Sequence, residues 1–252
     1  MSDEQWDAVS VNLGCGGPHS AEVEASAIDW IQRNAGEFAV VFAQELPQDD
    51  TWRGMWPDHE IFVSDGPTFR PRSAVIVTRD LTAEPFSYAT SGYHGSYVTA
   101  AKVGDVVLMS IHASPTRVSE DARTQWSDLI GGRAVEMRRC GLWDSDLVLE
   151  TIAHVRETSG AEGVIAAGDW NEARNWDRKH PNGGGVEFFT NVRSAGFDDV
   201  CCPGDKDGAP TRDDLRIDHV FASRSIGKMI EVTGLGADPP ADHRPVGFTI
   251  RL

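Results

Sequence analysis

Long hydrophobic runs and paired cysteines are both missing from this 252-residue sequence. No apolar run approaches the roughly 20 residues that a membrane-spanning helix requires. The acidic N-terminus lacks the basic segment that begins a signal peptide. The four cysteines show no Cys-x-x-Cys spacing, and the adjacent Cys201 and Cys202 make a poor disulfide framework. These absences predict a cytoplasmic protein with reduced thiols and no membrane segment, and no feature of the sequence indicates a protein partner.

Positive charge is scarce as well. The 23 lysines and arginines face 39 aspartates and glutamates, which gives a formal net charge of −16. A protein that binds DNA of any sequence tightly needs a basic surface, because binding is driven by the release of counterions from the phosphates. The charge therefore argues against that class of protein. It leaves room for an enzyme that holds one phosphate with a metal and a few arginines.

The composition predicts a single domain spanning residues 1–252, because no linker, repeat or low-complexity tract divides the chain. Apolar runs predict strands at 8–13, 39–45, 60–63, 74–78, 97–103, 106–112, 163–167, 216–221 and 246–251. Amphipathic stretches predict helices at 21–34, 119–139, 146–157 and 186–194. Residues 102–105 predict a hairpin turn, since Gly104 and Asp105 tolerate a positive φ. Alternating strands and helices could form a parallel sheet, but the hairpin and the closely spaced strands before it favour a mixed sheet.

A polar residue follows each of six apolar, strand-like runs, at the point where the strand would leave the core. These residues are Asn12 in VSVNLG, Glu45 in VVFAQEL, His112 in VVLMSIHAS, Asp169 and Asn171 in VIAAGDWN, Asp218 in LRIDHVF, and Asp242 with His243 in ADHRPV. Carboxylates and imidazoles gathered at strand ends are what a divalent metal and an activated water require. All of these positions are therefore candidate site residues.

Local chemistry supports two of these signals directly. In GDWN, Gly168 permits a sharp turn that places Asp169 and Asn171 on the same side. The carboxylate can then orient or deprotonate water, and the amide can donate to a phosphoryl oxygen. The alternative is an Asx-turn that only stabilises the loop. Glu45 ends a buried run, so its carboxylate is costly to desolvate unless it meets a cation or stays in contact with water.

The histidines allow more than one interpretation. Asp218 and His243 predict a carboxylate–imidazole pair, in which the carboxylate fixes the tautomer and steadies the charged ring. The ring could accept a proton from water or, once protonated, stabilise the oxygens of the reacting phosphate, and the sequence leaves both roles open. His112 could contact the phosphate, or it could be a satisfied structural donor at a strand end.

The ordered set from Asn12 to Pro245 resembles the endonuclease/exonuclease/phosphatase superfamily, particularly its deoxyribonuclease-like members. The resemblance implies an α/β fold, a four-layer αββα sandwich of two packed mixed β-sheets flanked by helices. It places the site at one end, where loops from both sheets meet, and it implies a Mg²⁺ or Mn²⁺ cofactor. In the matched positions the metal side has Glu45, Asp242 and Asn12, while the catalytic residues are Asp169, His243, Asp218, His112, Asn171 and Asn12.

The sequence departs from the family pattern in several places, among them Ala241 where serine is usual and the acidic stretch QELPQDD where DNA-cutting members often have an arginine after the glutamate. His219 replaces the aromatic or apolar residue that usually follows the aspartate at position 218. Pancreatic deoxyribonuclease carries a glutamate partner for the histidine that matches His112, and that partner cannot be identified here from the sequence. The resemblance therefore leaves open a role for His112 as an acid.

Basic and aromatic residues near the motifs are the candidates for holding a substrate. They are Arg72, Arg174, Trp176, Arg178 and Lys179. Each basic side chain could instead be a solvated surface charge, whereas Trp176 could stack on a base or a sugar. Trp170 is interpreted as a packing residue. The loop at 175–185 is expected to select the substrate, because its composition predicts a long connection on the surface.

The leading functional hypothesis is a divalent-metal-dependent hydrolase that acts on phosphate esters. Within that class we expect a nuclease that hydrolyses phosphodiester bonds in nucleic acid by metal-assisted in-line attack of water. The alternative is a phosphomonoesterase or a small-molecule phosphodiesterase, which the acidic charge favours. A catalytically inactive binding module is disfavoured by the presence of Glu45, Asp169 and His243. A cysteine-based enzyme or a zinc site has little support, because the cysteines lack ligand spacing.

Overall fold

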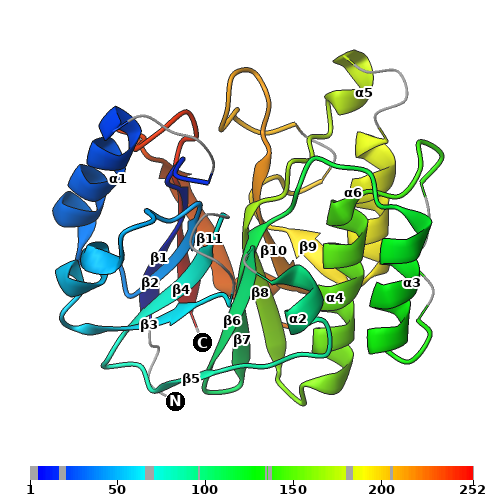
Figure 1. The fold of residues 1–252 in the computed structure, drawn as a ribbon, viewed down its shortest axis with the longest axis horizontal. Helices are drawn as coiled ribbons and strands as arrows, with labels where there is room; N and C mark the ends of the chain where they lie inside the picture. The colour runs from blue at the N-terminus through cyan, green and yellow to red at the C-terminus, as the bar shows by residue number, and fades with distance from the viewer. Residues whose placement is uncertain are drawn as a thin grey trace.

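Two packed β-sheets, each of six strands, form the centre of the molecule in the computed structural model (Figure 1). The structure describes residues 5–16, 21–65, 71–95, 97–133, 135, 138–179, 184–204 and 207–251. The first sheet has the order β11-β12-β1-β2-β4-β3, with bounds Ile230–Leu235, Val246–Arg251, Gln5–Asn12, Val40–Gln44, Ser73–Thr78 and His59–Val63. The second has the order β5-β6-β7-β8-β10-β9, with bounds Ala83–Pro85, Val98–Val103, Val106–His112, Gly163–Asp169, Asp218–Ser223 and Phe197–Asp199.

Each sheet is mixed, with one parallel pair of strands at its centre. β1 runs parallel to β2 and β7 runs parallel to β8, whereas the other paired strands are antiparallel. A helical connection joins each parallel pair, as parallel strands require. Side chains at the carboxyl ends of these four central strands touch one another. The parallel pairs of both sheets therefore end at one and the same end of the sandwich, opposite to the N and C labels of Figure 1.

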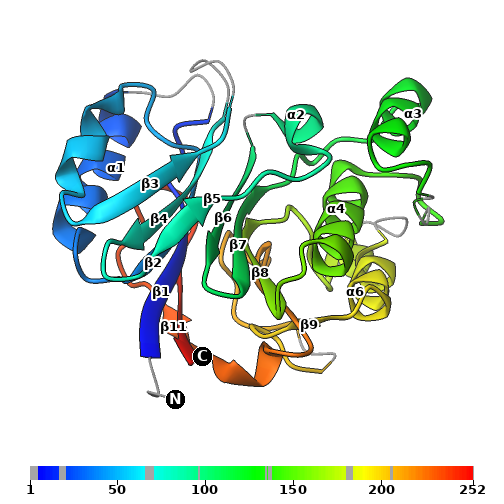
Figure 2. The ribbon, with the colours of Figure 1, turned by 90° about the horizontal axis from the view of Figure 1, so that it is seen from below.

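Helices cover the outer face of each sheet, which gives four layers (Figure 2). On the first sheet lie α1 (Ala21–Asn34) and a 3-10 helix (Asp50–Met55), and on the second lie α4 (Asp144–Thr158) and α6 (Gly185–Ser194), with α3 (Glu120–Leu129) packed against α4. The connections carry α2 (Ser91–His94), α5 (Trp176–Lys179) and a 3-10 helix (Gly227–Met229). This arrangement confirms the predicted αββα sandwich. None of the helices within the described ranges is both long enough and apolar enough to cross a bilayer.

The central strands have apolar side chains on both faces. In β2, Val40 and Phe42 pack between the two sheets, while Val41 and Ala43 pack toward α1. β8 alternates in the same way between the inter-sheet layer and the layer beneath α4 and α6. Because both faces are buried, these strands have unbroken apolar sequences instead of alternating ones. The first polar residue after each run therefore marks the point where the strand leaves the core.

A buried polar link joins the two sheets directly beneath that end. Gln44 Nε2 donates to Ser110 Oγ at 3.0 Å, and Ser110 Oγ donates to the carbonyl of Ala43 at 2.9 Å. Gln44 precedes Glu45 in the chain, and Ser110 lies two residues before His112. The link therefore fixes how β2 and β7 lie relative to each other just below two of the predicted site residues.

One expectation about secondary structure is wrong, and three short strands were not predicted. The helix predicted at 119–139 ends at Leu129, because Gly131 and Gly132 adopt φ angles of +68° and +81° and turn the chain. Ser119 caps this helix, and its hydroxyl accepts a backbone hydrogen bond from the first turn. The short strands β5, β9 and β11 were not predicted. Each lies at an edge of its sheet and leaves side chains exposed, so none of them has an unbroken apolar run.

A buried histidine connects the helices on the second sheet. His94, at the end of α2, has its Nε2 2.8 Å from Thr151 Oγ1 of α4. Trp126 of α3 donates from Nε1 to the same hydroxyl at 3.2 Å. Burial lowers the pKa of His94 to about 3, because the charged ring would lose its hydration. The ring is therefore neutral in the folded protein throughout the physiological pH range.

We expect His94 to make the protein less stable in mild acid. In the unfolded chain its pKa is about 6.5, so below that pH the unfolded state binds a proton that the folded state refuses. The free energy of unfolding should fall by about 1.4 kcal/mol per pH unit from this group as the pH drops from about 6.5 toward 3. Urea unfolding of wild type and His94→Gln between about pH 7 and pH 5 measures this contribution. His154→Gln is the matched control, and an identical pH dependence in wild type and His94→Gln would contradict the prediction.

Candidate active site

The register of the second sheet places three predicted residues side by side. His112, the last residue of β7, lies opposite Asp169 of β8, and Asp218 of β10 lies opposite Asp169 on its other side. Residues opposite each other on neighbouring strands project to the same face, so the three side chains are adjacent. Gly168 has a φ of +153°, and a Cβ at this position would overlap the carbonyl of Ile111. Only glycine therefore permits the close approach of β7 and β8 at the site.

Asn12 and Glu45 reach the same place from the first sheet. Asn12 Nδ2 donates to Glu45 Oε1 at 3.1 Å and to Asp169 Oδ2 at 3.2 Å, which bridges the two sheets. The backbone N–H of Gly16 donates to Glu45 Oε2 at 3.0 Å. Glu45 has a φ of +50°, a conformation that a residue with a side chain adopts only at a cost. These contacts hold the Glu45 carboxylate toward Asp169 despite that cost.

His243 and Asp218 form the predicted pair. His243 Nδ1 lies 3.0 Å from Asp218 Oδ2 and 3.2 Å from Oδ1, and both side chains are buried. Burial works against the charged ring, but the hydrogen bond and charge of Asp218, with the charges of Asp169 and Asp242, raise the pKa of His243 to about 9. Nδ1 therefore donates to Asp218, and a protonated ring presents its Nε2–H to the site. The raised pKa is what a charged ring requires, and the choice between the two roles of His243 stays a prediction.

Asp169 is the most buried carboxylate of the site, with a side chain only 2% exposed. Burial and the charge of Asp218 raise its pKa to about 6, although His243, His112 and the backbone N–H of Asn171 act in the opposite direction. Asp169 Oδ1 accepts the N–H of Asn171 at 2.9 Å, and Oδ2 lies 3.9 Å from His243 Nε2. A carboxylate that is ionised at neutral pH, yet more basic than usual, is suited to hold water or to take its proton.

His112 faces a glutamate that the sequence did not assign to it. Its Nε2 lies 3.2 Å from Glu45 Oε1 and 3.9 Å from Asp169 Oδ2. Within the described ranges, its Nδ1 is buried and has no hydrogen-bond partner. The carboxylate next to His112 is therefore Glu45, the residue expected on the metal side. A role for His112 as an acid stays a prediction.

Asn171 and Trp170 take different directions from the same loop. Asn171 also has a positive φ of +50°, and its Nδ2 donates to the carbonyl of Ala113 at 2.8 Å, which leaves its second amide hydrogen for another acceptor. Trp170 is fully buried, and its ring centroid lies 4.6 Å from the ring centroid of Phe221 and 6.1 Å from that of Phe188. The interpretation of Trp170 as a packing residue is confirmed.

Two overlapping groups of possible ligand atoms lie at the site, and the second includes His243, whose ring could bind a cation only in its neutral form. One atom from each of Glu45, His112 and Asp169 lies within 4.8 Å of the others, and the same holds for Asp169, Asp218 and His243. Asn12 adds an amide next to both groups. Carboxylates predominate, and Glu45 is partly exposed so that water can reach it. Such an oxygen-rich, partly hydrated set fits Mg²⁺ or Mn²⁺ better than a metal that prefers sulfur.

Asp242, expected on the metal side, belongs to neither of these groups. Its side chain is 59% exposed, with Oδ1 3.9 Å from His243 Nε2. Its Oδ2 forms an ion pair with Arg212 Nη2, and the two atoms are 2.7 Å apart. Arg212 was not among the sequence candidates, because it lies in an irregular segment and only the fold brings it to Asp242. The structure thus places Asp242 at the rim of the site, and its contact with a metal stays a prediction.

Arg72 supports the segment that follows Glu45. Its Nη2 donates to the carbonyl of Pro47 at 2.8 Å and lies 3.0 Å from Asp50 Oδ1, while its side chain is only 5% exposed. The carbonyl of Arg72 also accepts the N–H of Leu46 at 3.2 Å. These contacts fix the backbone next to Glu45, and a direct contact of Arg72 with a substrate stays a prediction.

The remaining substrate candidates come after the GDWN loop. The Arg174 guanidinium lies 3.4 Å from Asp199 Oδ2 and 4.1 Å from the centre of the Phe189 ring, on the helical side of the second sheet. Trp176 begins α5 and is partly buried. The side chains of Arg178 and Lys179 lie outside the described part of the structure. None of these four residues gains a defined role from the geometry.

A buried arginine supports the GDWN loop through an ion pair with the residue that follows the loop. The side chain of Arg138 is fully buried, and its guanidinium contacts both oxygens of Glu172, at 2.7 and 3.0 Å. Its Nε also lies 2.9 Å from Asp146 Oδ1 in α4. Glu172 directly follows Asn171, so this bidentate pair ties the catalytic loop to α4. No sequence signal indicated it, because Arg138 was expected to lie within a helix.

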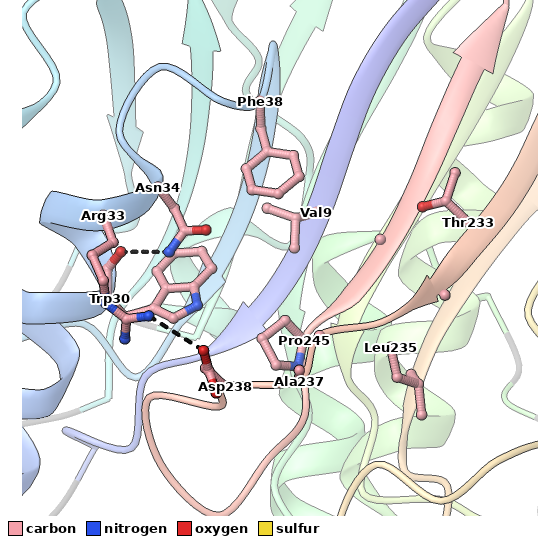
Figure 3. Close-up of a pocket in the computed structure, with 13 residues that line it drawn as sticks. Val9, Trp30, Arg33, Asn34, Phe38, Thr233, Leu235, Ala237, Asp238 and Pro245 are labelled. Carbon is pink, nitrogen blue, oxygen red and sulfur yellow. Dashed lines mark hydrogen bonds and ion pairs between the residues drawn. The ribbon is translucent and has the colours of Figure 1, made fainter.

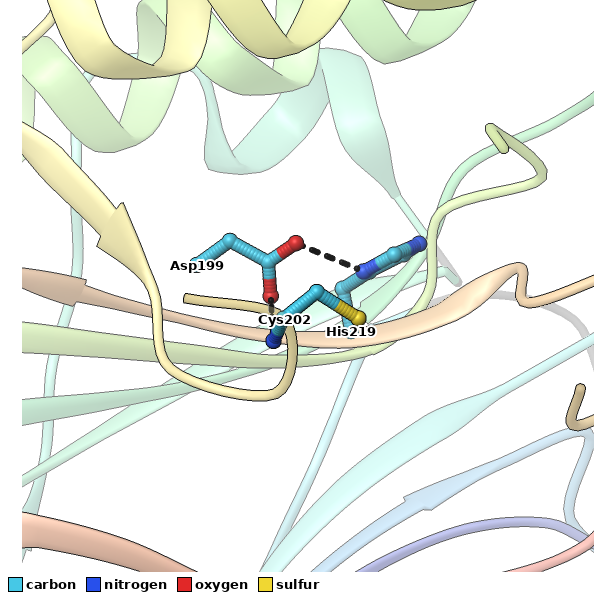
Figure 4. Close-up of side chains that lie close together, drawn as sticks. All are labelled: Asp199, Cys202 and His219. Atoms are coloured by element: carbon cyan, nitrogen blue, oxygen red, sulfur yellow. Dashed lines mark hydrogen bonds and ion pairs between the residues drawn. The ribbon is translucent and has the colours of Figure 1, made fainter. Parts of the chain in front are cut away.

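A second buried cluster contains His219, Asp199 and Cys202 (Figure 4). His219 Nε2 lies 3.0 and 3.1 Å from two backbone carbonyls and so donates to them, while Nδ1 faces Asp199 Oδ2 at 3.3 Å. Burial raises the pKa of Cys202 to about 11, so that it remains a thiol. Arg174 and Arg216 already place positive charge beside Asp199, which opposes a cation there. The cluster therefore links β9 to β10 structurally.

A groove of about 360 Å³ lies on the outer side of the first sheet, between α1 and β11 (Figure 3). Trp30 and Arg33 line it from α1, and Thr233 and Leu235 line it from β11. Arg33 Nη1 reaches Asp238 Oδ2 at 3.7 Å. None of the predicted site residues lines this groove, so it is separate from the site at the end of the sandwich.

Comparison with known proteins supports the fold assignment. No family model matches the sequence, and no curated protein matches it. Among solved structures, the endonuclease domain of TRAS1, a telomere-specific non-LTR retrotransposon, is 17% identical over 99% of both chains, with a TM-score of 0.64. The AP endonuclease LMAP from Leishmania major is 12% identical over 98% of this chain and 88% of its own, with a TM-score of 0.69. An endonuclease/exonuclease/phosphatase from Bacteroides vulgatus is 13% identical over 99% of both chains, with a TM-score of 0.61.

The chain has the fold of the endonuclease/exonuclease/phosphatase superfamily. Its likeness to these structures extends over nearly its whole length. At such low identities the likeness concerns the fold, so the chemistry has to be argued from the site itself.

We expect Asp218→Asn to lower the pKa of His243 by at least about one unit, because it removes the charge that stabilises the imidazolium. The ring would then titrate close to neutral pH instead of near pH 9. NMR titration of the histidine rings in metal-free protein, assigned with His243→Gln, measures this shift. Asp198→Asn, an exposed carboxylate on β9, is the control. An unchanged His243 titration in Asp218→Asn would show that the pair does not set the charge of the ring.

Proposed function

We propose that the protein is a divalent-metal-dependent phosphoesterase that hydrolyses phosphodiester bonds in nucleic acid by in-line attack of water. One observation carries the proposal: Asn12 bridges Glu45 of the first sheet and Asp169 of the second, next to His243. This set combines a cation site, a basic carboxylate and a charged imidazole in one small volume. The likeness in fold to nuclease structures supports the same reaction class.

The chain's own residues divide the work according to their contacts. Asp169, held through Oδ1 by Asn171 and through Oδ2 by Asn12, orients the attacking water and takes its proton. His243, kept charged by Asp218, donates from Nε2 to a phosphoryl oxygen and stabilises the charge that grows there. The second amide hydrogen of Asn171 is available to a further phosphoryl oxygen.

Glu45 and Asp169 are the residues that would hold the cation, and Asn12, whose Nδ2 donates to both carboxylates, orients them. When bound, Mg²⁺ or Mn²⁺ supplies positive charge that polarises the phosphoryl oxygens. Both oxygens of Glu45 are oriented before any ion arrives, because the backbone N–H of Gly16 holds Oε2 and the side-chain amide of Asn12 holds Oε1. This preorganisation lowers the cost of assembling the site.

A small phosphate ester is the second candidate substrate. The net charge of −16 favours it, because a long polyanion is repelled by an acidic surface, whereas a single phosphate is not held off to the same degree. The two candidates share the site and its chemistry, and they differ only in what surrounds the phosphate.

Hydrolysis should depend on a divalent cation and on both sides of the site. We expect Asp169→Asn and His243→Ala each to lower kcat by at least about a hundredfold, because each removes a group that acts on the reacting phosphate or water. The measurement is nicking of supercoiled plasmid with Mg²⁺ or Mn²⁺, with EDTA as the metal-free condition. Asp238→Asn, a carboxylate at the remote groove, is the control and should keep its activity.

The substrate class follows from the same assay. Intact plasmid together with hydrolysis of a small phosphate ester would move the assignment to the second candidate. Activity that survives EDTA, or that is unchanged in Asp169→Asn, would refute the proposed chemistry.

A further inference from the structure

Arg212 occupies a tight turn at the rim of the site. The N–H groups of Thr211 and Arg212 both donate to the carbonyl of Leu215, at 2.9 and 3.0 Å, and the N–H of Leu215 donates back to Arg212 at 2.9 Å. Asp213 within this turn has a φ of +49°. The turn therefore has a defined shape, which sets the direction in which the arginine leaves the backbone.

The turn is anchored on both sides of the Asp218–His243 pair. Thr211 Oγ1 accepts the backbone N–H of Asp218 at 3.2 Å. On the other side, the N–H of Arg244 donates to the carbonyl of Thr211 at 2.8 Å. Arg244 follows His243 in the chain. The base of the Arg212 side chain is thus fixed relative to the two residues that stabilise the phosphate.

The partner of Arg212 connects it to the reacting centre. Arg212 Nη2 lies 2.7 Å from Asp242 Oδ2, while Oδ1 of the same carboxylate lies 3.9 Å from His243 Nε2. The Asp242 carboxylate therefore contacts the Arg212 guanidinium with one oxygen and approaches His243 Nε2, the nitrogen proposed to face the phosphate, with the other. Both side chains of the ion pair are about half exposed, at 43% and 59%.

An exposed pair of this kind is easily exchanged. Surface ion pairs contribute only about 0–1 kcal/mol, so the carboxylate does not hold the arginine strongly. A phosphate offers the planar guanidinium two oxygens at once and makes stronger, charge-assisted hydrogen bonds. An anionic group that enters beside the site can therefore replace Asp242 as the partner of Arg212.

Two other candidate arginines are committed to internal partners. Arg72 is buried against Asp50, and Arg174 is buried against Asp199. Within the described ranges, Arg212 is the arginine that an ion pair joins to a predicted site residue. On a chain with a net charge of −16, an exposed guanidinium at the rim has a large effect on which anion is accepted.

We propose that Arg212 forms a second anion subsite that binds a phosphate next to the scissile one. The inference rests on the proposed function and names its substrate class: an oligonucleotide, or a nucleotide ester with a phosphate beside the cleaved bond. Arg212 selects substrate by exchanging Asp242 for that second phosphate. A lone phosphodiester leaves the subsite empty and loses this binding energy.

The test compares substrates that differ only in the second phosphate. They are the dinucleoside monophosphate thymidylyl-thymidine and the same molecule with an added 5′- or 3′-phosphate, each hydrolysed with Mg²⁺ or Mn²⁺. We expect the wild type to prefer one phosphorylated form by at least about tenfold in kcat/KM, which corresponds to about 1.4 kcal/mol. In Arg212→Gln the ratio should fall to about one, and Arg212→Lys should keep part of it.

Arg251→Gln is the matched control, because Arg251 also forms an exposed ion pair, with Glu231, at the opposite end of the sandwich. Its preference should equal that of the wild type. Equal hydrolysis of all three substrates by the wild type, or an unchanged ratio in Arg212→Gln, would overturn the subsite while the proposed function stands. Hydrolysis of none of them by the wild type would count against the proposed function itself, and the subsite would fall with it.

Discussion

Burial of Asp169 beside other carboxylates is the constraint on which the rest of the site depends. Its side chain is almost fully buried, with Asp218 opposite it on β10 and Glu45 within the same group of ligand atoms. Carboxylates that lie this close together repel one another when ionised, and their desolvation adds to the free-energy cost of keeping them charged. Asn12 and the charged ring of His243 offset part of this cost in the folded protein. A cation bound beside these carboxylates would reduce their repulsion, which is why a site with this geometry favours positive charge.

Most central strands could be predicted from the sequence because burial on both faces leaves a clear pattern, whereas the αββα sandwich was implied only by the resemblance to the superfamily. The runs that end at Gln44, His112 and Asp169 are almost wholly apolar, with Ser110 as an exception in the second, so their ends could be located. The hairpin before β7 was equally clear, since Gly104 adopts the positive φ that the turn needs. Edge strands such as β11 carry no comparable signal, because half of their surface faces water.

What the sequence could not predict are contacts between segments that no local pattern relates. Arg138 meets Glu172 across 34 residues, and Arg212 meets Asp242 although β10 and β11 lie between them in the chain. His94 has its partner on a helix 57 residues away. Each of these contacts depends on how finished elements pack, so side-chain type alone gave no indication. The same holds for the glutamate next to His112, which lies in a different sheet.

The division of the site between two sheets couples its chemistry to folding. Asn12 and Glu45 belong to one sheet and Asp169 to the other, and the Gln44–Ser110 link fixes their alignment. A ligand that touches both halves binds the assembled sandwich and neither sheet alone. By linkage, such a ligand at a hundred times its Kd adds about 2.7 kcal/mol to stability. Ligand binding and unfolding are thus linked equilibria. Thermal denaturation can therefore report the affinity of a ligand without any turnover.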